Sequence, residues 1–97
     1  MPKIIVPGEV RALIRKLHPD LKRKLKASLK MILSAPHSGK ALMDELSGLR
    51  SFRVGSFRII YRAEYPKKIE LVAIGPRARI YEETFRIVRK KKGAEKK

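Results

Sequence analysis

The spacing of the apolar residues changes once along this chain, and that change limits the folds open to it. In the first third of the sequence apolar residues recur every three or four positions, as at Val10, Leu13 and Leu17, which is the spacing of one helix face. Between residues 50 and 63 the period becomes two, which is the period of a strand. The pattern therefore predicts helices first and sheet strands after them.

Glycine and proline residues mark the ends of the expected elements. Pro19 suits the first position of a helix, and Gly55-Ser56 suits the turn of a tight hairpin between two strands. We expect a strand, two helices that form an antiparallel hairpin, three strands and a last helix, at residues 3–6, 9–17, 19–35, 50–54, 57–63, 69–74 and 80–88. The order β-α-α-β-β-β-α predicts an α+β fold, in which a mostly antiparallel sheet carries the helical hairpin on one face and leaves the other face open.

The length of 97 residues and the hydrophobic content of 43% suit a single small domain, which we place at residues 1–88 before a basic tail at residues 89–97. No apolar run reaches the roughly 18 residues of a membrane span, and the N-terminus lacks the apolar stretch of a secretory signal. We therefore expect a cytoplasmic protein without a membrane partner. There is no cysteine, and the histidines and acids lack metal-ligand spacing, so we expect no metal and no cofactor.

The net charge of +16, from 25 basic and 9 acidic residues, predicts a polyanionic partner, because bound phosphates release counterions. Arginine, which contacts phosphate with two parallel hydrogen bonds, is concentrated in the second half. The hairpin alone holds Arg50, Arg53, Arg58 and Arg62. Alternation places Arg53 and one arginine of the partner strand on the same exposed face. That face is either a solvated basic surface or a phosphate-binding site.

The hairpin also carries a longer pattern. Residues 49–61 read LRSFRVGSFRIIY, residues 74–77 read IGPR, and Ile80-Tyr81 follows. This combination resembles the RelE/ParE toxin superfamily, and the likeness extends over nearly the whole chain, including the two helices. The resemblance implies a RelE-like fold and a toxin of a type II toxin-antitoxin module. RelE-type members cleave mRNA in the ribosomal A site, whereas ParE-type members poison DNA gyrase, so the fold alone does not choose between them.

The resemblance also implies a catalytic set, Arg53, Arg58, Arg77 and Tyr81. Cleavage of RNA requires an aligned 2′-OH, charge stabilisation at phosphorus and a proton for the 5′-oxygen. Arg53 and Arg58 suit the second task, Tyr81 suits orienting or deprotonating the 2′-OH, and Arg77 suits steadying the leaving oxygen. A competing interpretation packs the Tyr81 ring on the sheet.

Two positions depart from the family pattern. Pro76 stands where many members have His or Lys, and Ser51 stands where some RelE-type proteins have a second Lys. We therefore expect a proton-transfer group of those members to be absent here.

The sequence thus predicts a ribosome-dependent mRNA endonuclease that acts through 2′-OH attack without a metal. Two alternatives stay open: a ParE-type DNA gyrase inhibitor, and a non-catalytic basic RNA-binding module. Expected partners are the ribosome, mRNA and a cognate acidic antitoxin. The residues expected to bind RNA or the ribosome are Arg50, Arg62, Arg79, Arg89, Lys90, Lys91 and Lys92. The tail from residue 89 onward suits a nucleic-acid arm and equally suits uncommitted solvated charge.

Overall fold

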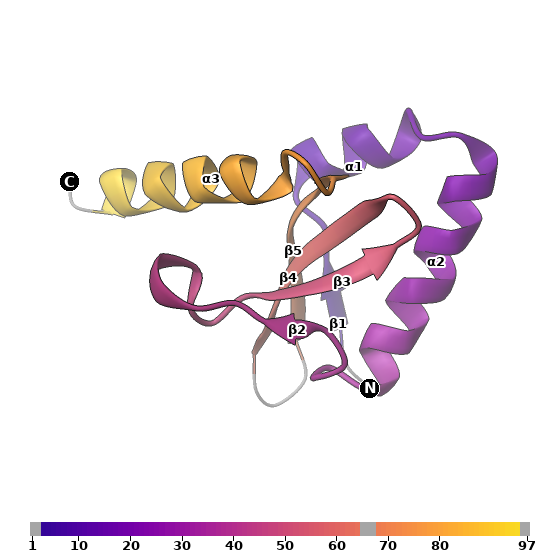
Figure 1. Ribbon diagram of the computed structural model, residues 1–97, viewed down its shortest axis with the longest axis horizontal. Coiled ribbons are helices and arrows are strands. Elements are labelled where there is room, and N and C mark those ends of the chain that lie inside the picture. Colours follow the sequence, from indigo (N-terminus) through magenta and orange to yellow (C-terminus); the bar gives the residue numbers. More distant parts are fainter. Residues whose placement is uncertain (1–2, 65–67, 96–97) are drawn as a thin grey trace.

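A five-stranded sheet organises the chain in the computed structural model, which describes residues 3–64 and 68–95 (Figure 1). The elements are β1 (Lys3–Ile5), α1 (Gly8–Arg15), α2 (Pro19–Ser34), β2 (Lys40–Ala41), the 3₁₀ turn η1 (Asp44–Leu46), β3 (Arg50–Val54), β4 (Phe57–Glu64), β5 (Lys68–Pro76) and α3 (Ile80–Glu95). The strand order is β1-β5-β4-β3-β2. β1 pairs with β5 in parallel, whereas the pairs β5–β4, β4–β3 and β3–β2 are antiparallel. The predicted α+β class and mostly antiparallel sheet are confirmed.

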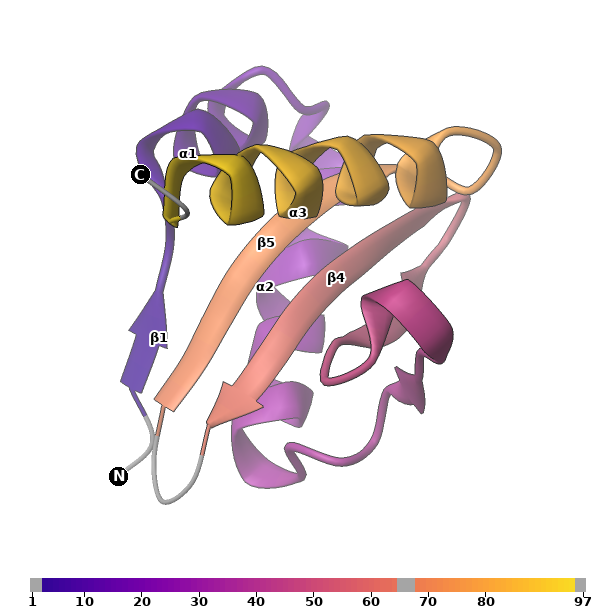
Figure 2. The ribbon, with the colours of Figure 1, turned by 90° about the vertical axis from the view of Figure 1, so that its left-hand side faces the viewer.

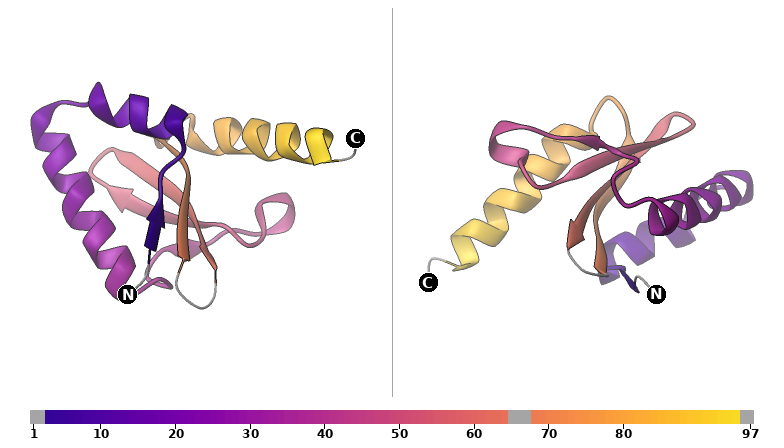
Figure 3. Two further views of the ribbon diagram at one scale, coloured as in Figure 1. Left: turned by 180° about the vertical axis from the view of Figure 1, so that it is seen from behind. Right: turned by 90° about the horizontal axis from the view of Figure 1, so that it is seen from below.

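Helices α1 and α2 cover one face of the sheet, as the sequence predicts. The helix break falls at the expected proline: Pro19 opens α2, and the ring Nδ1 of His18 accepts a hydrogen bond from the backbone of Asp20 at 3.1 Å. The two helices meet at a corner and diverge, rather than running alongside each other as a hairpin (Figures 1 and 3). Each buries its apolar side against the sheet instead, α1 on β5 and α2 on β3.

The second sheet face is covered in part, so the prediction of an open face is wrong. Figure 2 shows the sheet between α3 in front and α2 behind. Ile60, Val72 and Ile80 are buried on this side, and Leu46 and Ile87 pack against them. The central strands are apolar on both faces, which requires cover on both. A register shift between Ile60 and Tyr61 contributes, because it lets the adjacent residues 72 and 73 of β5 both join this second cluster.

The segment between α2 and β3, expected to be a loop, contains β2 and η1. It is held by Tyr61, whose side chain is fully buried. The Tyr61 hydroxyl donates to the Pro36 carbonyl at 2.8 Å and accepts from the Gly39 amide at 3.0 Å. Arg50 adds a bond from its guanidinium to the Gly39 carbonyl at 2.8 Å. We call this arrangement of Pro36, Gly39, Arg50 and Tyr61 the tyrosine clasp; it positions β2 beside β3.

Helix α3 is longer than the expected 80–88 and continues to Glu95. Residues 89–95 of the expected basic tail are therefore helical, while the division of the chain at residue 88 stays a prediction. Figure 1 shows α3 projecting sideways beyond the sheet. Within residues 3–64 and 68–95, no helix combines the length and the apolar character needed to cross a membrane.

The tyrosine clasp leaves no room for a side chain at residue 39. An added Cβ would lie 2.6 Å from the Tyr61 hydroxyl and 3.1 Å from the Ser51 carbonyl. We expect Gly39→Ala to lower the free energy of unfolding by about 1–3 kcal/mol, as overpacked substitutions do, in urea denaturation. Gly8→Ala is the control, because nothing lies within 4 Å of its Cβ. Equal stability of the two variants would contradict the role given to the clasp.

Candidate active site

The β3–β4 hairpin sets two arginines side by side. Its short turn is made possible by Gly55, whose φ of 59° suits a residue without a side chain. The resulting register pairs Arg53 with Arg58, so both project from the same face. The alternation prediction is confirmed here. Like charges directly opposite each other destabilise a sheet, so the pairing works against the hairpin that carries it.

A third arginine reaches the same place from the end of β5. The backbone amide of Arg77 donates to the carbonyl of Ser56 at 3.2 Å, which ties the turn after β5 to the hairpin turn. Arg53, Arg58 and Arg77 then line one hollow of about 210 Å³, together with Gly55, Ser56 and Phe57. We call it the arginine hollow. Three arginines along one hollow make it suited to an anion with several oxygens, such as a phosphate diester.

Arg58 is the most enclosed member of this set. Its Nη1 donates to the Ser51 hydroxyl at 3.4 Å. Its Nε is buried and has no hydrogen-bond partner within the part of the chain that the structure describes. A buried donor without a partner costs free energy.

Tyr81 joins the set through Ser51. It is the second residue of α3, and its hydroxyl lies 3.4 Å from the Ser51 hydroxyl. Tyr81 is 37% exposed, so its ring is partly buried, and the catalytic role and the packing role considered for it both stay predictions. Ser51 therefore contacts both Arg58 and Tyr81. The sequence pattern marked it only as a departure from Lys, although alternation already placed it on the face of Arg53.

The other predicted binding residues whose side chains are described lie outside the arginine hollow. Arg50 belongs to the tyrosine clasp, and Arg62 lies 3.9 Å from Glu70 in an ion pair. Arg79 is exposed in the turn before α3, and Arg89 stacks on Phe85. The side chains of Lys90, Lys91 and Lys92 lie outside the described residues. A role in binding RNA or the ribosome stays a prediction for all of them.

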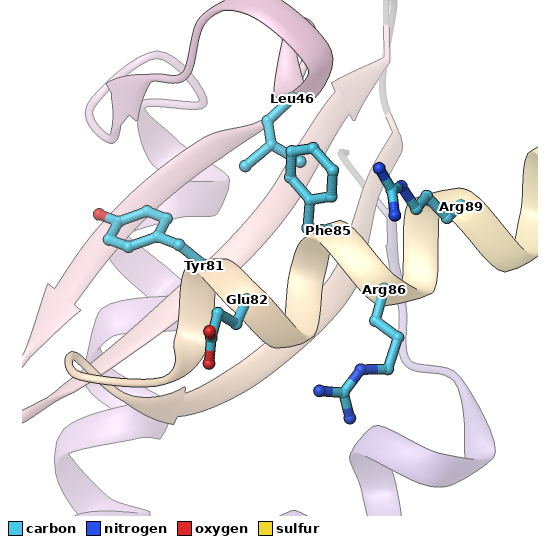
Figure 4. A pocket seen from close by; sticks show the side chains of 6 residues that line it. All are labelled: Leu46, Tyr81, Glu82, Phe85, Arg86 and Arg89. Carbon is cyan, nitrogen blue, oxygen red and sulfur yellow. The ribbon is translucent and has the colours of Figure 1, made fainter.

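A second hollow lies beside Tyr81 and was not foreseen from the sequence (Figure 4). It has a volume of about 420 Å³ and is lined by Leu46, Tyr81, Glu82, Phe85, Arg86 and Arg89. The helical spacing of Tyr81 and Phe85 could have indicated it, but the other wall comes from η1, which has no clear sequence signal. Among the described residues, no group of three or more His, Cys, Asp or Glu side chains could hold a metal ion.

Comparisons with known proteins define the family of this chain. Residues 9–81 match the family model described as the ParE toxin of type II toxin-antitoxin system, parDE. The chain therefore belongs to this toxin family, within the RelE/ParE superfamily, as the sequence motifs indicate. No curated protein sequence matches the chain.

Solved structures share the fold. The toxin-antitoxin complex RelBE2 from Mycobacterium tuberculosis has a chain that is 26% identical, with a TM-score of 0.64 and coverage of 78% of this chain and 98% of that chain. A mutant of the E. coli toxin RelE in the free state is 16% identical, with a TM-score of 0.72 and coverage of 91% and 94%. The archaeal RelE–RelB complex from Pyrococcus horikoshii OT3 is 20% identical, with a TM-score of 0.67 and coverage of 80% and 97%. The predicted RelE-like fold is confirmed.

If Arg58 serves a ligand rather than the fold, removing its charge should not cost stability. We expect Arg58→Met to leave the free energy of unfolding unchanged or to raise it by about 0.2–1 kcal/mol, because it removes the repulsion from Arg53. The gain should shrink at high salt. Urea denaturation at two salt concentrations measures both effects.

Arg62→Met is the matched control on the same strand, since Arg62 has the carboxylate of Glu70 as a partner. It should lower stability by about 0–1 kcal/mol. A larger loss for Arg58→Met than for Arg62→Met would show that Arg58 supports the fold.

Proposed function

We propose that this toxin cleaves mRNA on the ribosome, without a metal, by attack of a ribose 2′-oxygen on the adjacent phosphorus. The observation that carries the proposal is the arginine hollow, in which Arg53, Arg58 and Arg77 converge while Tyr81 is linked to Arg58 through Ser51. The four residues come from β3, β4, the turn after β5 and α3. A solvated basic face would not require these separate elements to meet.

The chemistry follows from the positions of these groups. The 2′-oxygen forms a bond to phosphorus and the bond to the 5′-oxygen breaks, which leaves a 2′,3′-cyclic phosphate and a 5′-hydroxyl. Negative charge grows on the non-bridging oxygens, where Arg53 and Arg58 would stabilise it. Tyr81 would orient or deprotonate the 2′-OH.

Arg77 would stabilise charge on the leaving 5′-oxygen. A guanidinium remains protonated in proteins. Arg77 would therefore stabilise the negative charge on the 5′-oxygen, and water would deliver the proton to that oxygen. With Pro76 and Ser51 at two positions where other members carry His or Lys, the site depends on charge and alignment, and the ribosome would hold the RNA in its reactive conformation.

Loss of the Arg58 charge should affect turnover far more than binding. We expect Arg58→Met to lower kcat for cleavage of a translated mRNA by about 10²-fold or more, while ribosome affinity barely changes, because the interaction is made chiefly in the transition state. Primer extension on ribosome-bound mRNA measures cleavage. Arg15→Met, at the exposed end of α1, is the control and should retain full activity.

The basic end of α3 should behave in the opposite way. Replacing Lys90, Lys91 and Lys92 by Gln should weaken ribosome binding and flatten its salt dependence, because these charges act through counterion release, while kcat is retained. Equal loss of binding in this variant and in Arg58→Met would reduce Arg58 to one more contact of a basic face.

A second candidate is inhibition of DNA gyrase, which the match of residues 9–81 to the ParE family model favours. The two activities leave different products. Cuts within ribosome-protected codons support mRNA cleavage, whereas double-strand breaks in plasmid DNA, formed only with gyrase, support the second candidate. A chain that binds RNA and yields neither product would be a non-catalytic RNA-binding module.

We also propose that an acidic antitoxin neutralises this toxin. Two of the structural relatives, from M. tuberculosis and P. horikoshii, are toxin-antitoxin complexes, and the charge of +16 favours an acidic partner that folds as it binds. Such a partner would cover Arg53, Arg58 and Arg77 or displace α3. Co-expression with the neighbouring open reading frame tests this: a small acidic protein should co-purify and restore growth, and its absence would contradict the proposal.

A further inference from the structure

The 420 Å³ hollow beside Tyr81 has the features of a site for an unpaired nucleobase. Its six lining residues, named above, come from η1 and α3. We call this hollow the base groove. Its volume lies within the range of roughly 300–1,000 Å³ typical of small-ligand sites. Figure 4 shows the rings of Tyr81 and Phe85 on neighbouring turns of α3, with Leu46 opposite Phe85. The groove therefore offers flat aromatic surface beside an aliphatic wall.

The Arg89 guanidinium and the Phe85 ring already stack on each other in the base groove. Tyr81, Phe85 and Arg89 follow one another at four-residue intervals, so they share one side of α3. The guanidinium carbon of Arg89 lies 5.1 Å from the centre of the Phe85 ring. Aromatic rings and guanidinium planes are the surfaces on which proteins stack the bases of single-stranded RNA. Phe85 and Arg89 together form a platform that a base would extend.

The base groove is connected to the arginine hollow through side-chain contacts. Tyr81 lines the groove, and its hydroxyl contacts Ser51, which contacts Arg58. We expect a strand with its phosphate in the hollow to pass Tyr81 and to place a neighbouring nucleotide in the groove. Arg86 and Arg89, both exposed, stand beside that path and can meet the next phosphates, and Glu82 is the one acid among the lining residues.

We propose that the base groove binds an unpaired RNA base next to the phosphate held in the arginine hollow, by stacking on Phe85 and Arg89. The position of that phosphate rests on the proposed function, but binding in the groove does not require cleavage. An acidic peptide would satisfy the arginines without using the flat surface, and the experiment separates the two ligands.

The chain contains no tryptophan, so Phe85→Trp places a single fluorescent reporter in the groove. Six-residue oligoadenylate is the probe, and an abasic ribose-phosphate strand of equal length carries the charge without the bases. We expect oligoadenylate to quench the reporter strongly and the abasic strand to leave it nearly unchanged. Met31→Trp, on an exposed position of α2, is the control and should respond to neither.

Equal quenching by the abasic strand would overturn the proposal, since charge alone would then explain the signal. So would equal quenching by hexaglutamate, which would make the groove a site for acidic protein segments.

A second measurement does not depend on the reporter. Phe85→Leu keeps apolar volume beside Leu46 but removes the ring, and it should weaken binding of labelled oligoadenylate about 5- to 100-fold, as the loss of one stacked base does. Phe85→Tyr should restore binding. Unchanged affinity in Phe85→Leu, in a variant that circular dichroism shows to be folded, would overturn the proposal.

The outcome for the proposed function can be told apart from the outcome for the base groove. Base-dependent quenching without cleavage on the ribosome would retain the groove and reject the nuclease, while cleavage without base-dependent quenching would do the reverse.

Discussion

The register of β3 against β4 is the constraint on which the rest of this structure depends. Because side chains alternate, a slip of one residue would move every side chain of β3 to the opposite face. In the observed register Phe52 and Val54 face the core under α1 and α2, while Ser51 and Arg53 face the site. The same alternation on β4 sends Tyr61 inward to the clasp and Arg58 outward. One pairing therefore builds the core and the arginine hollow together.

Apolar contacts of β4 stabilise that register, whereas the repulsion between Arg53 and Arg58 opposes it. Ile59 and Tyr61 are fully buried on one side of β4, and Ile60 is fully buried on the other. Burying such side chains stabilises a fold by about 1.5–3 kcal/mol each, whereas facing like charges on a sheet cost about 0.2–1 kcal/mol. The core therefore holds Arg53 against Arg58 without an anion present. A site organised in this way needs little rearrangement when an anion binds.

The sequence predicted the parts of the fold that local signals encode. The change of period and Gly55 were sufficient to predict the hairpin and its facing arginines. Pro19 was sufficient to predict the break between the two helices. The segment at 40–46 was missed because β2 and η1 depend on the hydroxyl of Tyr61, a contact between residues more than twenty positions apart. The second covered face was missed because Ile60 and Val72 gain their partners from α3, across the sheet. The length of α3 was missed because its lysines suit solvated charge as well as helix.

For the candidate site, the sequence supplied the residue types, and the structure supplied the link between them. Spacing alone gave no reason to join Tyr81 to the arginines. Ser51, a small residue, contacts both Arg58 and Tyr81. Small size matters here, because a long side chain at residue 51 would occupy the space between Arg58 and Tyr81.

The arginines of the hollow differ in how far they are already held in place. Arg58 is half-buried and donates to the Ser51 hydroxyl, while it faces Arg53 across the hairpin. Arg53 and Arg77 are exposed. Ordering an exposed side chain on binding costs conformational entropy, whereas much of that cost for Arg58 is already met when the chain folds. The arginine that needs the least ordering is therefore also the one that faces a like charge, and an anion bound in the hollow would relieve the repulsion between Arg53 and Arg58.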